Sequence, residues 1–369
     1  MRRIPIEYAK AGDVIGKTIY NNLGGMLLSE GARLSESNIK QLRKLGCLNI
    51  YIEDRYTEET IEEIIKPKAM KRIHRLQANL NNIVVDFNKT GKVDRKLVDT
   101  NVKGIKETIN EIVDEVVFSK NIFDHLISIS IYDDYTMNHS LNVMMLSAVI
   151  ARNKHLSMDE IKKLAIGCIF HDIGKIFIPI EIINKPGKLT AEEFKIVKGH
   201  SEKGYEFLKN YTDLSATSID IALCHHERED GSGYPRELVG KEIHLYSKIA
   251  SICDVFDALT SDRSYRRAAP VNEAMEYLLA SSGDGFSVET IKTFAESINV
   301  FPKDTLVSLS DGREGIICEA NNEIYSRPKI KIYGEGNKEV RPYIIDLMDT
   351  NNVVIDKVLY EFSFAKQNG

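Results

Sequence analysis

The sequence lacks several features that mark particular classes of protein. No segment approaches the ~20 consecutive apolar residues that a membrane-spanning helix requires. The first seven residues contain charges and a proline where a signal peptide has a longer apolar stretch. The five cysteines form no C-x-x-C pair, which indicates reduced thiols and not a disulfide framework. We therefore expect a cytoplasmic protein, for which docking to a membrane-bound partner stays open.

The chain also lacks an excess of positive charge. Its net charge is −5, whereas a sequence-independent nucleic-acid binder is normally basic. This balance argues against a nucleic-acid polymer as partner, but it allows a small anionic ligand held by a local cluster of Arg and Lys. A length of 369 residues, without an internal repeat or a low-complexity tract, is typical of two to three domains.

Hydrophobic periodicity divides the chain into four segments. Residues 1–55 alternate short apolar runs with turn residues, which predicts a small β-rich module. Residues 56–120 predict a helical connecting segment, which either pairs with itself in a homodimer or packs on the neighbouring domain. Residues 121–300 alternate long helical patterns with short polar loops. Residues 301–369 predict a second β module, with a hairpin that turns at Asp311-Gly312. The predicted fold class is therefore multidomain, with a central all-α domain between two small β-rich modules.

The residues suited to metal binding lie almost entirely in the helical segment 121–300. They are His139, His171, Asp172, His200, His225, His226 and Asp254. Neutral imidazole and carboxylate groups suit divalent iron, manganese or zinc, and the lack of thiolates argues against a structural zinc finger.

The flanking residues strengthen this interpretation. The apolar run 166–170 carries His171 and Asp172 into the interior, where a buried carboxylate is costly unless a cation compensates it. Lys175 follows three residues after Asp172 and so lies on the same helical face. A second apolar run, 219–224, leads into the pair at 225–226, and both imidazoles can reach a metal cluster if the helix ends there.

Three sequence blocks resemble the HD-GYP subgroup of the HD phosphohydrolase superfamily. They are HDIGK at 171–175, HHEREDGSGYP at 225–235 and DVFDALTSDRSYR at 254–266. The resemblance covers about residues 125–300 and implies an all-α HD-type domain. It also implies hydrolysis of cyclic di-GMP to linear pGpG, with GMP as an optional further product.

The resemblance assigns roles to individual positions. The family's metal ligands fall on all seven His and Asp residues named above, which implies two divalent metal ions. Iron or manganese is favoured because five imidazoles suit borderline cations better than magnesium. The family's phosphate-facing lysine matches Lys175, and its contacts to the substrate phosphate match Arg263 and Arg266. The planar guanidinium of arginine suits phosphate because it donates two parallel hydrogen bonds.

The sequence departs from the family pattern in two places. Some members bind a third metal through a glutamate one helical turn before the first histidine ligand, but here that position is Tyr135 and Asp134 is one residue out of register. We therefore expect two metals. The family's usual Gly-x-x-Phe-Asp-Pro segment is altered to GDGFSV at 283–288, which we expect to affect packing only.

The ligand set suggests a mechanism. Two cations ~3.5–4 Å apart can bridge a water, lower its pKa and hold it for in-line attack on a phosphodiester. We expect Asp172 to bridge the ions, with one ion held mainly by His139, His171 and Asp254, and the other by His200, His225 and His226. Asp172 and Lys175 are the catalytic candidates. Tyr234 either shapes a guanine pocket or supports the fold.

Three other functions remain open at this stage. The first is hydrolysis of another nucleotide, such as cyclic GMP-AMP, ppGpp or a dNTP, and the tripeptide at 233–235 favours a cyclic dinucleotide. The second is a non-catalytic cyclic-dinucleotide receptor, which the complete ligand set disfavours. The third is an oxygen-activating di-iron centre, but Lys175, Arg263 and Arg266 favour a phosphate substrate.

Overall fold

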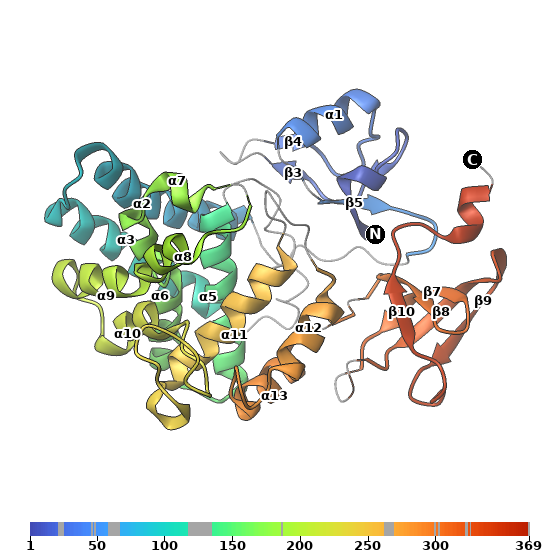
Figure 1. Ribbon diagram of the computed structural model, residues 1–369. Coiled ribbons are helices and arrows are strands. Elements are labelled where there is room, and N and C mark those ends of the chain that lie inside the picture. The colour runs from blue at the N-terminus through green and yellow to red at the C-terminus, as the bar shows by residue number, and fades with distance from the viewer. Residues whose placement is uncertain are drawn as a thin grey trace.

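The computed structural model shows a helical domain beside two small β modules (Figure 1). The structure describes residues 1–369 apart from 21–25, 46, 48, 58–66, 117–134, 186, 262–268, 299, 302, 322–323, 325 and 368–369. No described helix is both long enough and apolar enough to cross a membrane. The predicted fold class is confirmed, with helices in the centre of the chain and antiparallel sheets on either side.

The N-terminal module packs short strands against one helix. Its elements are β1 (Arg2–Pro5), η1 (Ile6–Tyr8), β2 (Val14–Ile15), β3 (Ile19–Tyr20), β4 (Met26–Leu28), α1 (Glu36–Lys44) and β5 (Asn49–Glu53). The order in the three-stranded sheet is β1-β5-β2, and β3 pairs with β4 in an antiparallel hairpin. Helix α1 starts one turn earlier than the apolar pattern alone suggests, because Ser35 and Asn38 form a capping box.

Two long helices follow, α2 (Pro67–Thr90) and α3 (Arg95–Val116). They pack against each other, and α3 also packs on α5 and α6 of the central domain. Leu76, Ile105 and Ile109 are fully buried in the same hydrophobic core as the central helices. The segment thus packs on the neighbouring domain, and its pairing with itself in a homodimer stays a prediction.

The central domain is a layered bundle of helices. Its elements are α5 (Tyr135–Asn153), α6 (Met158–Ile169), η2 (Ile173–Phe177), α7 (Ile180–Ile183), α8 (Ala191–Lys198), α9 (His200–Tyr211), α10 (Ala216–Cys224), η3 (Gly240–Glu242), α11 (Leu245–Thr260), α12 (Val271–Ala280) and α13 (Val288–Ser297). Helices α5, α6, α10 and α11 pack side by side. Every described residue of α5 from Leu141 to Ala151 is buried, so this helix forms the centre of the bundle.

The C-terminal module is a five-stranded antiparallel sheet. Its elements are β6 (Leu306–Leu309), β7 (Arg313–Glu319), β8 (Lys329–Glu335), β9 (Lys338–Asp346), β10 (Ile355–Val358) and η4 (Ser363–Gln367). The strand order is β10-β6-β7-β8-β9, and the β6–β7 hairpin turns at Asp311-Gly312 as the sequence predicts.

The two β modules contact each other although they lie at opposite ends of the sequence. The ring of Tyr56 packs edge-on against Tyr333 and Phe362, with centroids 5.0 and 4.8 Å apart. The guanidinium of Arg2 donates a hydrogen bond to the carbonyl of Tyr360 at 2.5 Å. From the sequence the two modules are predicted as separate units, and this contact between them is not predicted.

Candidate metal centre

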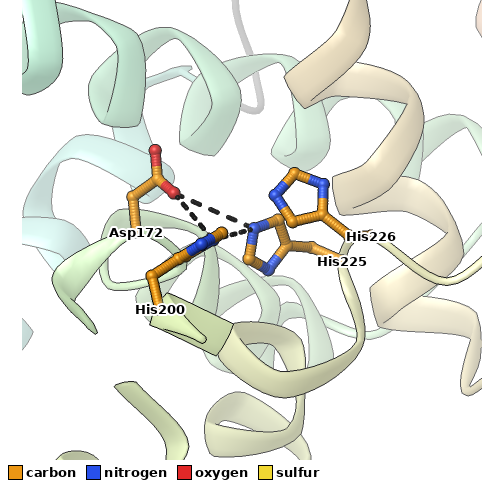
Figure 2. Close-up of side chains that lie close together, drawn as sticks. All are labelled: Asp172, His200, His225 and His226. Atoms are coloured by element: carbon orange, nitrogen blue, oxygen red, sulfur yellow. Dashed lines mark hydrogen bonds and ion pairs between the residues drawn. The ribbon is translucent and has the colours of Figure 1, made fainter. Parts of the chain in front are cut away.

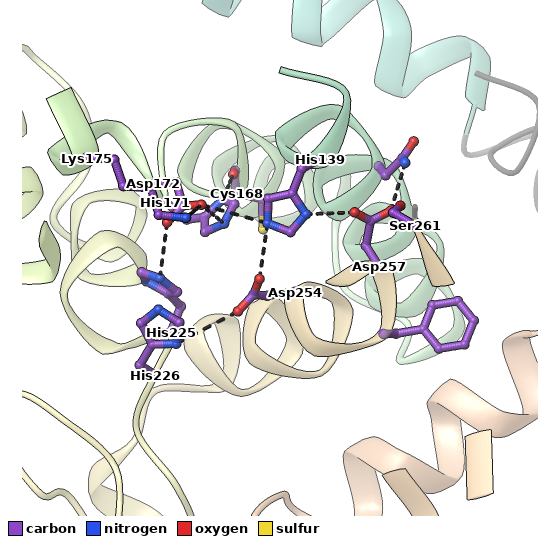
Figure 3. Close-up of polar contacts among 12 residues, drawn as sticks. His139, Cys168, His171, Asp172, Lys175, His225, His226, Asp254, Asp257 and Ser261 are labelled. Carbon is purple, nitrogen blue, oxygen red and sulfur yellow. Dashed lines mark hydrogen bonds and ion pairs between the residues drawn. The ribbon is translucent and has the colours of Figure 1, made fainter. Parts of the chain in front are cut away.

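Five helices bring the seven predicted ligand side chains close together; Figure 2 labels His200 and Figure 3 labels the other six. His139 lies in the first turns of α5, and Asp254 lies in the middle of α11. His171 and Asp172 follow the end of α6, His200 begins α9, and the pair at 225–226 follows the end of α10. The helix end expected before the pair at 225–226 is confirmed. The sequence placed Asp172 and Lys175 on one helical face, but α6 ends at Ile169 and Lys175 lies in the 3-10 helix η2. A helix end allows two adjacent residues to face the metal centre together.

The seven side chains form two groups, each with its donor atoms within 4.8 Å of one another. One group consists of Asp172, His200, His225 and His226 (Figure 2). The other group consists of His139, His171 and Asp254. This division matches the distribution of ligands that the sequence predicts between two ions, with Asp172 next to both groups.

Asp172 lies at the junction between the two groups. Its Oδ1 is 3.4 Å from Nε2 of His200 and 3.9 Å from Nε2 of His225. Its Oδ2 is 3.3 Å from Nε2 of His171 and 3.8 Å from Nε2 of His139. The two carboxylate oxygens therefore face different sets of imidazoles, which is the arrangement that a bridging ligand needs.

Three of the histidines are oriented by carbonyl groups of the preceding helical turn. The Nδ1 contacts are His171 to Cys168 O at 2.7 Å, His200 to Val197 O at 2.6 Å and His225 to Ile221 O at 3.0 Å. A carbonyl only accepts, so each Nδ1 carries the proton and each Nε2 keeps its lone pair for the centre. This fixed tautomer is typical of histidines that bind metal ions.

Asp257 orients a fourth histidine, His139. No function for Asp257 was predicted from the sequence. Its Oδ2 is 2.7 Å from Nδ1 of His139, and its Oδ1 accepts a hydrogen bond from Nδ2 of Asn142 at 2.7 Å. Asp257 is buried one helical turn after Asp254 in α11. The spacing of three residues between these two aspartates is the sequence signal that could have identified it.

One ligand nitrogen of the centre has no hydrogen-bond partner among the described side chains. Nε2 of His171 is buried and has no hydrogen-bond partner among the described residues. A buried polar atom without a partner is costly, and a bound cation would satisfy it. The orphaned nitrogen, the fixed tautomers and the imidazole–carboxylate donor set all fit a pair of divalent metal ions.

The protonation of the histidines also suits a cation. Burial lowers the pKa of His200 and of His225, and it lowers the pKa of His226 to about 3. These imidazoles are neutral near pH 7, which is the form that binds a metal. Burial acts in the same direction on His139, but its contacts with Asp254 and Asp257 outweigh burial and raise its pKa to about 9.

The two central carboxylates remain charged despite their burial. Burial alone would raise the pKa of Asp172, but Lys175 and His171 hold it well below the usual range. Burial would also raise the pKa of Asp254, and His139 is the main group that lowers it. The centre therefore holds two buried carboxylates in their anionic form, which attract a cation.

Lys175 and Tyr234 lie at the edges of this centre. Nζ of Lys175 forms an ion pair with Oδ2 of Asp172, as its position three residues later predicts. The ring of Tyr234 stacks on the imidazole of His226, with centroids 4.7 Å apart and planes inclined by 30°. Tyr234 thus supports a predicted ligand from one side, and its role toward a base remains a prediction.

Two glycines allow the backbone to approach closely around the centre. A Cβ atom at Gly174 would lie 1.9 Å from the carbonyl oxygen of His200. A Cβ atom at Gly233 would lie 2.5 Å from Cα of Glu227 and 2.6 Å from the carbonyl oxygen of His226. Neither position has room for a side chain, so glycine in HDIGK and in the GYP tripeptide is a steric requirement.

Glu227 is a second functional residue that the sequence analysis missed. Its carboxylate is buried and accepts hydrogen bonds from the backbone N–H groups of Arg236 and Leu238, at 2.8 and 3.0 Å. It therefore holds the loop that carries Tyr234 against the end of α10. An acidic residue directly after the histidine pair is the only sequence signal for this contact.

Three predicted or compared positions are not placed by the structure. Arg263, Arg266 and Asp134 lie outside the described residues. Tyr135 starts α5, but its side chain also lies outside the described set. The altered segment 283–288 packs on the GYP loop, where Asp230 N donates a hydrogen bond to the carbonyl of Asp284 at 2.9 Å.

Comparison with known families and structures identifies the type of domain that contains this centre. The HD domain family model matches residues 121–287. A solved structure of Bd1817, described as a HDG"Y"P protein from Bdellovibrio bacteriovorus, aligns with a TM-score of 0.54 at 16% identity, over 79% of this chain and 97% of that one. At this identity the similarity shows the shared fold alone.

Three curated relatives are similar to this chain in sequence. A cyclic di-GMP phosphodiesterase, PA4108, of Pseudomonas aeruginosa is 33% identical over 63% of this chain and 56% of its own length. A cyclic di-GMP phosphodiesterase of Thermotoga maritima is 38% identical over 48% of this chain and 49% of its own length. The 3'3'-cGAMP-specific phosphodiesterase 2 of Vibrio cholerae is 34% identical over 57% of this chain and 41% of its own length.

The matched region contains the buried His–Asp centre and the GYP tripeptide. Residues 121–287 of the chain therefore match an HD domain, and the chain is similar in sequence to cyclic-dinucleotide phosphodiesterases. It spans about half the length of the relatives named here.

Proposed function

We propose that this protein is a metal-dependent phosphodiesterase that hydrolyses cyclic di-GMP to linear pGpG. The observation that carries the proposal is the pair of adjacent ligand groups that meet at Asp172. Such a pair suits two divalent ions, and two-metal sites are typical of enzymes that cleave phosphate esters. The relatives that share this region are named as cyclic-dinucleotide phosphodiesterases, which supports the substrate class.

We assign the metal ligands as the sequence predicts. One ion is held mainly by His139, His171 and Asp254, and the other by His200, His225 and His226, with Asp172 between them. We favour iron or manganese, because five imidazoles suit borderline cations. When bound, these ions lower the pKa of a water molecule and neutralise charge on the phosphate oxygens.

The residues of the chain contribute position and charge. Asp172 is anionic and its two carboxylate oxygens face different imidazoles, so it would be a ligand shared by the two ligand groups. Lys175, beside Asp172 and partly exposed, provides a cation for a non-bridging oxygen of the phosphate that is cleaved. Arg263 and Arg266 remain proposed contacts to the substrate phosphates. Tyr234 and Glu227 keep the loop after α10 closed against His226.

Cyclic GMP-AMP is the second candidate substrate. It is favoured by the similarity to 3'3'-cGAMP-specific phosphodiesterase 2 of Vibrio cholerae, which extends over 215 residues. The metal centre acts on the phosphodiester that both substrates share, so its geometry does not separate them. Discrimination must come from residues that face the bases.

A product assay on the full chain tests this function. The protein is loaded with Mn²⁺, or anaerobically with Fe²⁺, and incubated in ¹⁸O-labelled water with cyclic di-GMP, cyclic GMP-AMP or ppGpp. We expect linear pGpG with one ¹⁸O atom in its terminal phosphate. Binding of cyclic di-GMP without any product would instead identify a receptor.

A pair of matched variants links the product to the centre. Asp172→Asn removes the charge between the ligand groups and should lower turnover by at least ~10²-fold. Asp159 is an exposed carboxylate at the start of α6 that forms an ion pair with Lys163, so Asp159→Asn should leave turnover unchanged. Equal turnover in the two variants would reject the proposed mechanism.

A further inference from the structure

A second lysine lies at the rim of the metal centre and is held by aromatic rings. Lys198 is the last residue of α8, two residues before His200. Its Nζ lies 4.9 Å from the centroid of the Tyr234 ring and 5.1 Å from that of Phe194. Within the described part of the chain, no carboxylate lies within ion-pair distance of this Nζ. The positive charge is therefore not neutralised by a described acidic side chain.

The rings connect this cation to the centre. Tyr234 stacks on His226 and makes an edge-to-face contact with His200, with centroids 6.5 Å apart. Lys198 is only partly buried, and the ring of Phe194 is 48% exposed. A ligand bound at the metal centre can therefore extend over Tyr234 and meet an ammonium group and an open aromatic face.

The chemistry of a cyclic dinucleotide requires such a group. The molecule carries two anionic phosphodiesters, and only one of them is cleaved at a time. The metal ions and Lys175 serve the phosphate that is cleaved, so the other phosphate needs cations outside the centre. A lysine at the rim would share this role with Arg263 and Arg266, the proposed contacts to the substrate phosphates. An ammonium group with three donors suits a phosphate, and the cation–π contacts restrict its motion before the ligand binds.

We propose that Lys198, seated on Phe194 and Tyr234, binds the phosphate of the cyclic dinucleotide that is not being cleaved. This assignment rests on the proposed function and adds a substrate-binding residue to it. Lys198 contributes to the affinity for substrates with two phosphates and contributes little to the chemistry at the metal ions.

The test compares a substrate with two phosphodiesters and a substrate with one. Steady-state kinetics are measured on the metal-loaded full chain with cyclic di-GMP and with bis(p-nitrophenyl) phosphate, which has a single phosphodiester. Lys198→Met removes the charge and keeps most of the aliphatic stem, and Lys198→Arg keeps the charge. The control is Lys209→Met in α9, since Lys209 makes the same kind of contact with Tyr205, at 5.4 Å, on the adjacent helix.

The two substrates should respond differently. Lys198→Met should raise KM for cyclic di-GMP about 10- to 100-fold more than it changes KM for bis(p-nitrophenyl) phosphate, because a hydrogen bond to a charged group is lost. Lys198→Arg should restore most of the affinity, and metal content should equal that of Lys209→Met.

Contrary results would separate the two proposals. An equal loss on both substrates, or a loss of bound metal, would show that Lys198 supports the centre and does not bind the second phosphate. An unchanged KM for cyclic di-GMP would also reject the assignment while leaving the proposed function intact. A wild-type chain that cleaves bis(p-nitrophenyl) phosphate but no cyclic dinucleotide would reject the proposed function, and the Lys198 assignment with it.

Discussion

Asp257 holds His139 by a contact of 2.7 Å between Oδ2 and Nδ1, and the two residues are 118 positions apart in the chain. This contact directs Nε2 of His139 toward Asp254, 3.1 Å away. A carboxylate behind a metal-binding imidazole fixes its orientation and raises its basicity. Asp257 is therefore not a predicted ligand, but it controls the orientation of His139, which is one.

The first prediction concerns this contact. Asp257→Asn keeps the shape of the side chain but removes its charge, so His139 should lose its fixed orientation. We expect metal affinity and turnover to fall about 10- to 100-fold. Metal titration and steady-state kinetics measure both. The control is Asp213→Asn, an exposed carboxylate at the end of α9, and equal values in the two variants would show that Asp257 does not act through His139.

The second prediction concerns removal of the metal ions. A chelator should abolish turnover and lower the melting temperature, because ions that bind only the folded state stabilise it by mass action. Adding Mn²⁺ or Fe²⁺ should restore both, and metal analysis should give two ions per chain. His171→Ala should show no stabilisation by added metal. A melting temperature that does not respond to chelation in the wild-type protein would contradict a structural contribution of the ions.

The third prediction concerns the close approach at Gly174. Alanine there would place Cβ 1.9 Å from the carbonyl oxygen of His200, so η2 and α9 must separate. The free energy of unfolding, measured with denaturant, should fall by ~1–3 kcal/mol. Gly285→Ala is the control, because its Cβ would meet its nearest neighbours at 3.4 Å. Similar stability of the two variants would mean that the backbone at Gly174 moves without cost.

The fourth prediction concerns Glu227. Glu227→Gln replaces one acceptor oxygen by a donor, so only one of the N–H groups of Arg236 and Leu238 can keep its bond. We expect a loss of ~1–3 kcal/mol, because a buried donor is left without a partner. Hydrogen exchange at these two amides should become faster. Glu192→Gln, at an exposed position in α8, serves as the control, and unchanged exchange in Glu227→Gln would exclude the proposed loop contact.

The fifth prediction concerns the thiols. Burial raises the pKa of Cys47 to about 11 and the pKa values of Cys168 and Cys224 to about 12, and it also raises that of Cys253. The reactive form is the thiolate, so at pH 8 these groups stay protonated and inaccessible in the folded protein. Iodoacetamide should modify Cys318, the partly exposed thiol, first, and all five in urea. Mass spectrometry identifies the sites. Rapid modification of Cys168 without denaturant would contradict its burial.

The sequence predicted the parts of the structure that depend on local patterns. The hairpin at Asp311-Gly312 and the helix end before His225 are encoded by a few adjacent residues, and the structure confirms them. The convergence of the seven side chains was predicted through the family resemblance, because no local pattern specifies which helices become neighbours.

The parts that the sequence did not predict depend on distant partners. Asp257 is one polar residue in an otherwise apolar helix, and its partner His139 lies on another helix. Glu227 bonds to backbone groups, which carry no residue-specific signal. The contact between Tyr56 and Phe362 joins two modules whose sequences show no matching pattern.

The enclosure of Tyr56 by rings from the C-terminal module has a mechanical consequence. Strand β5 leads to this residue, Tyr333 lies in β8, and Phe362 follows β10. Because these rings pack against each other, a ligand or a force that displaces one β module should displace the other as well. The two β modules would then transmit a single input to the helical domain.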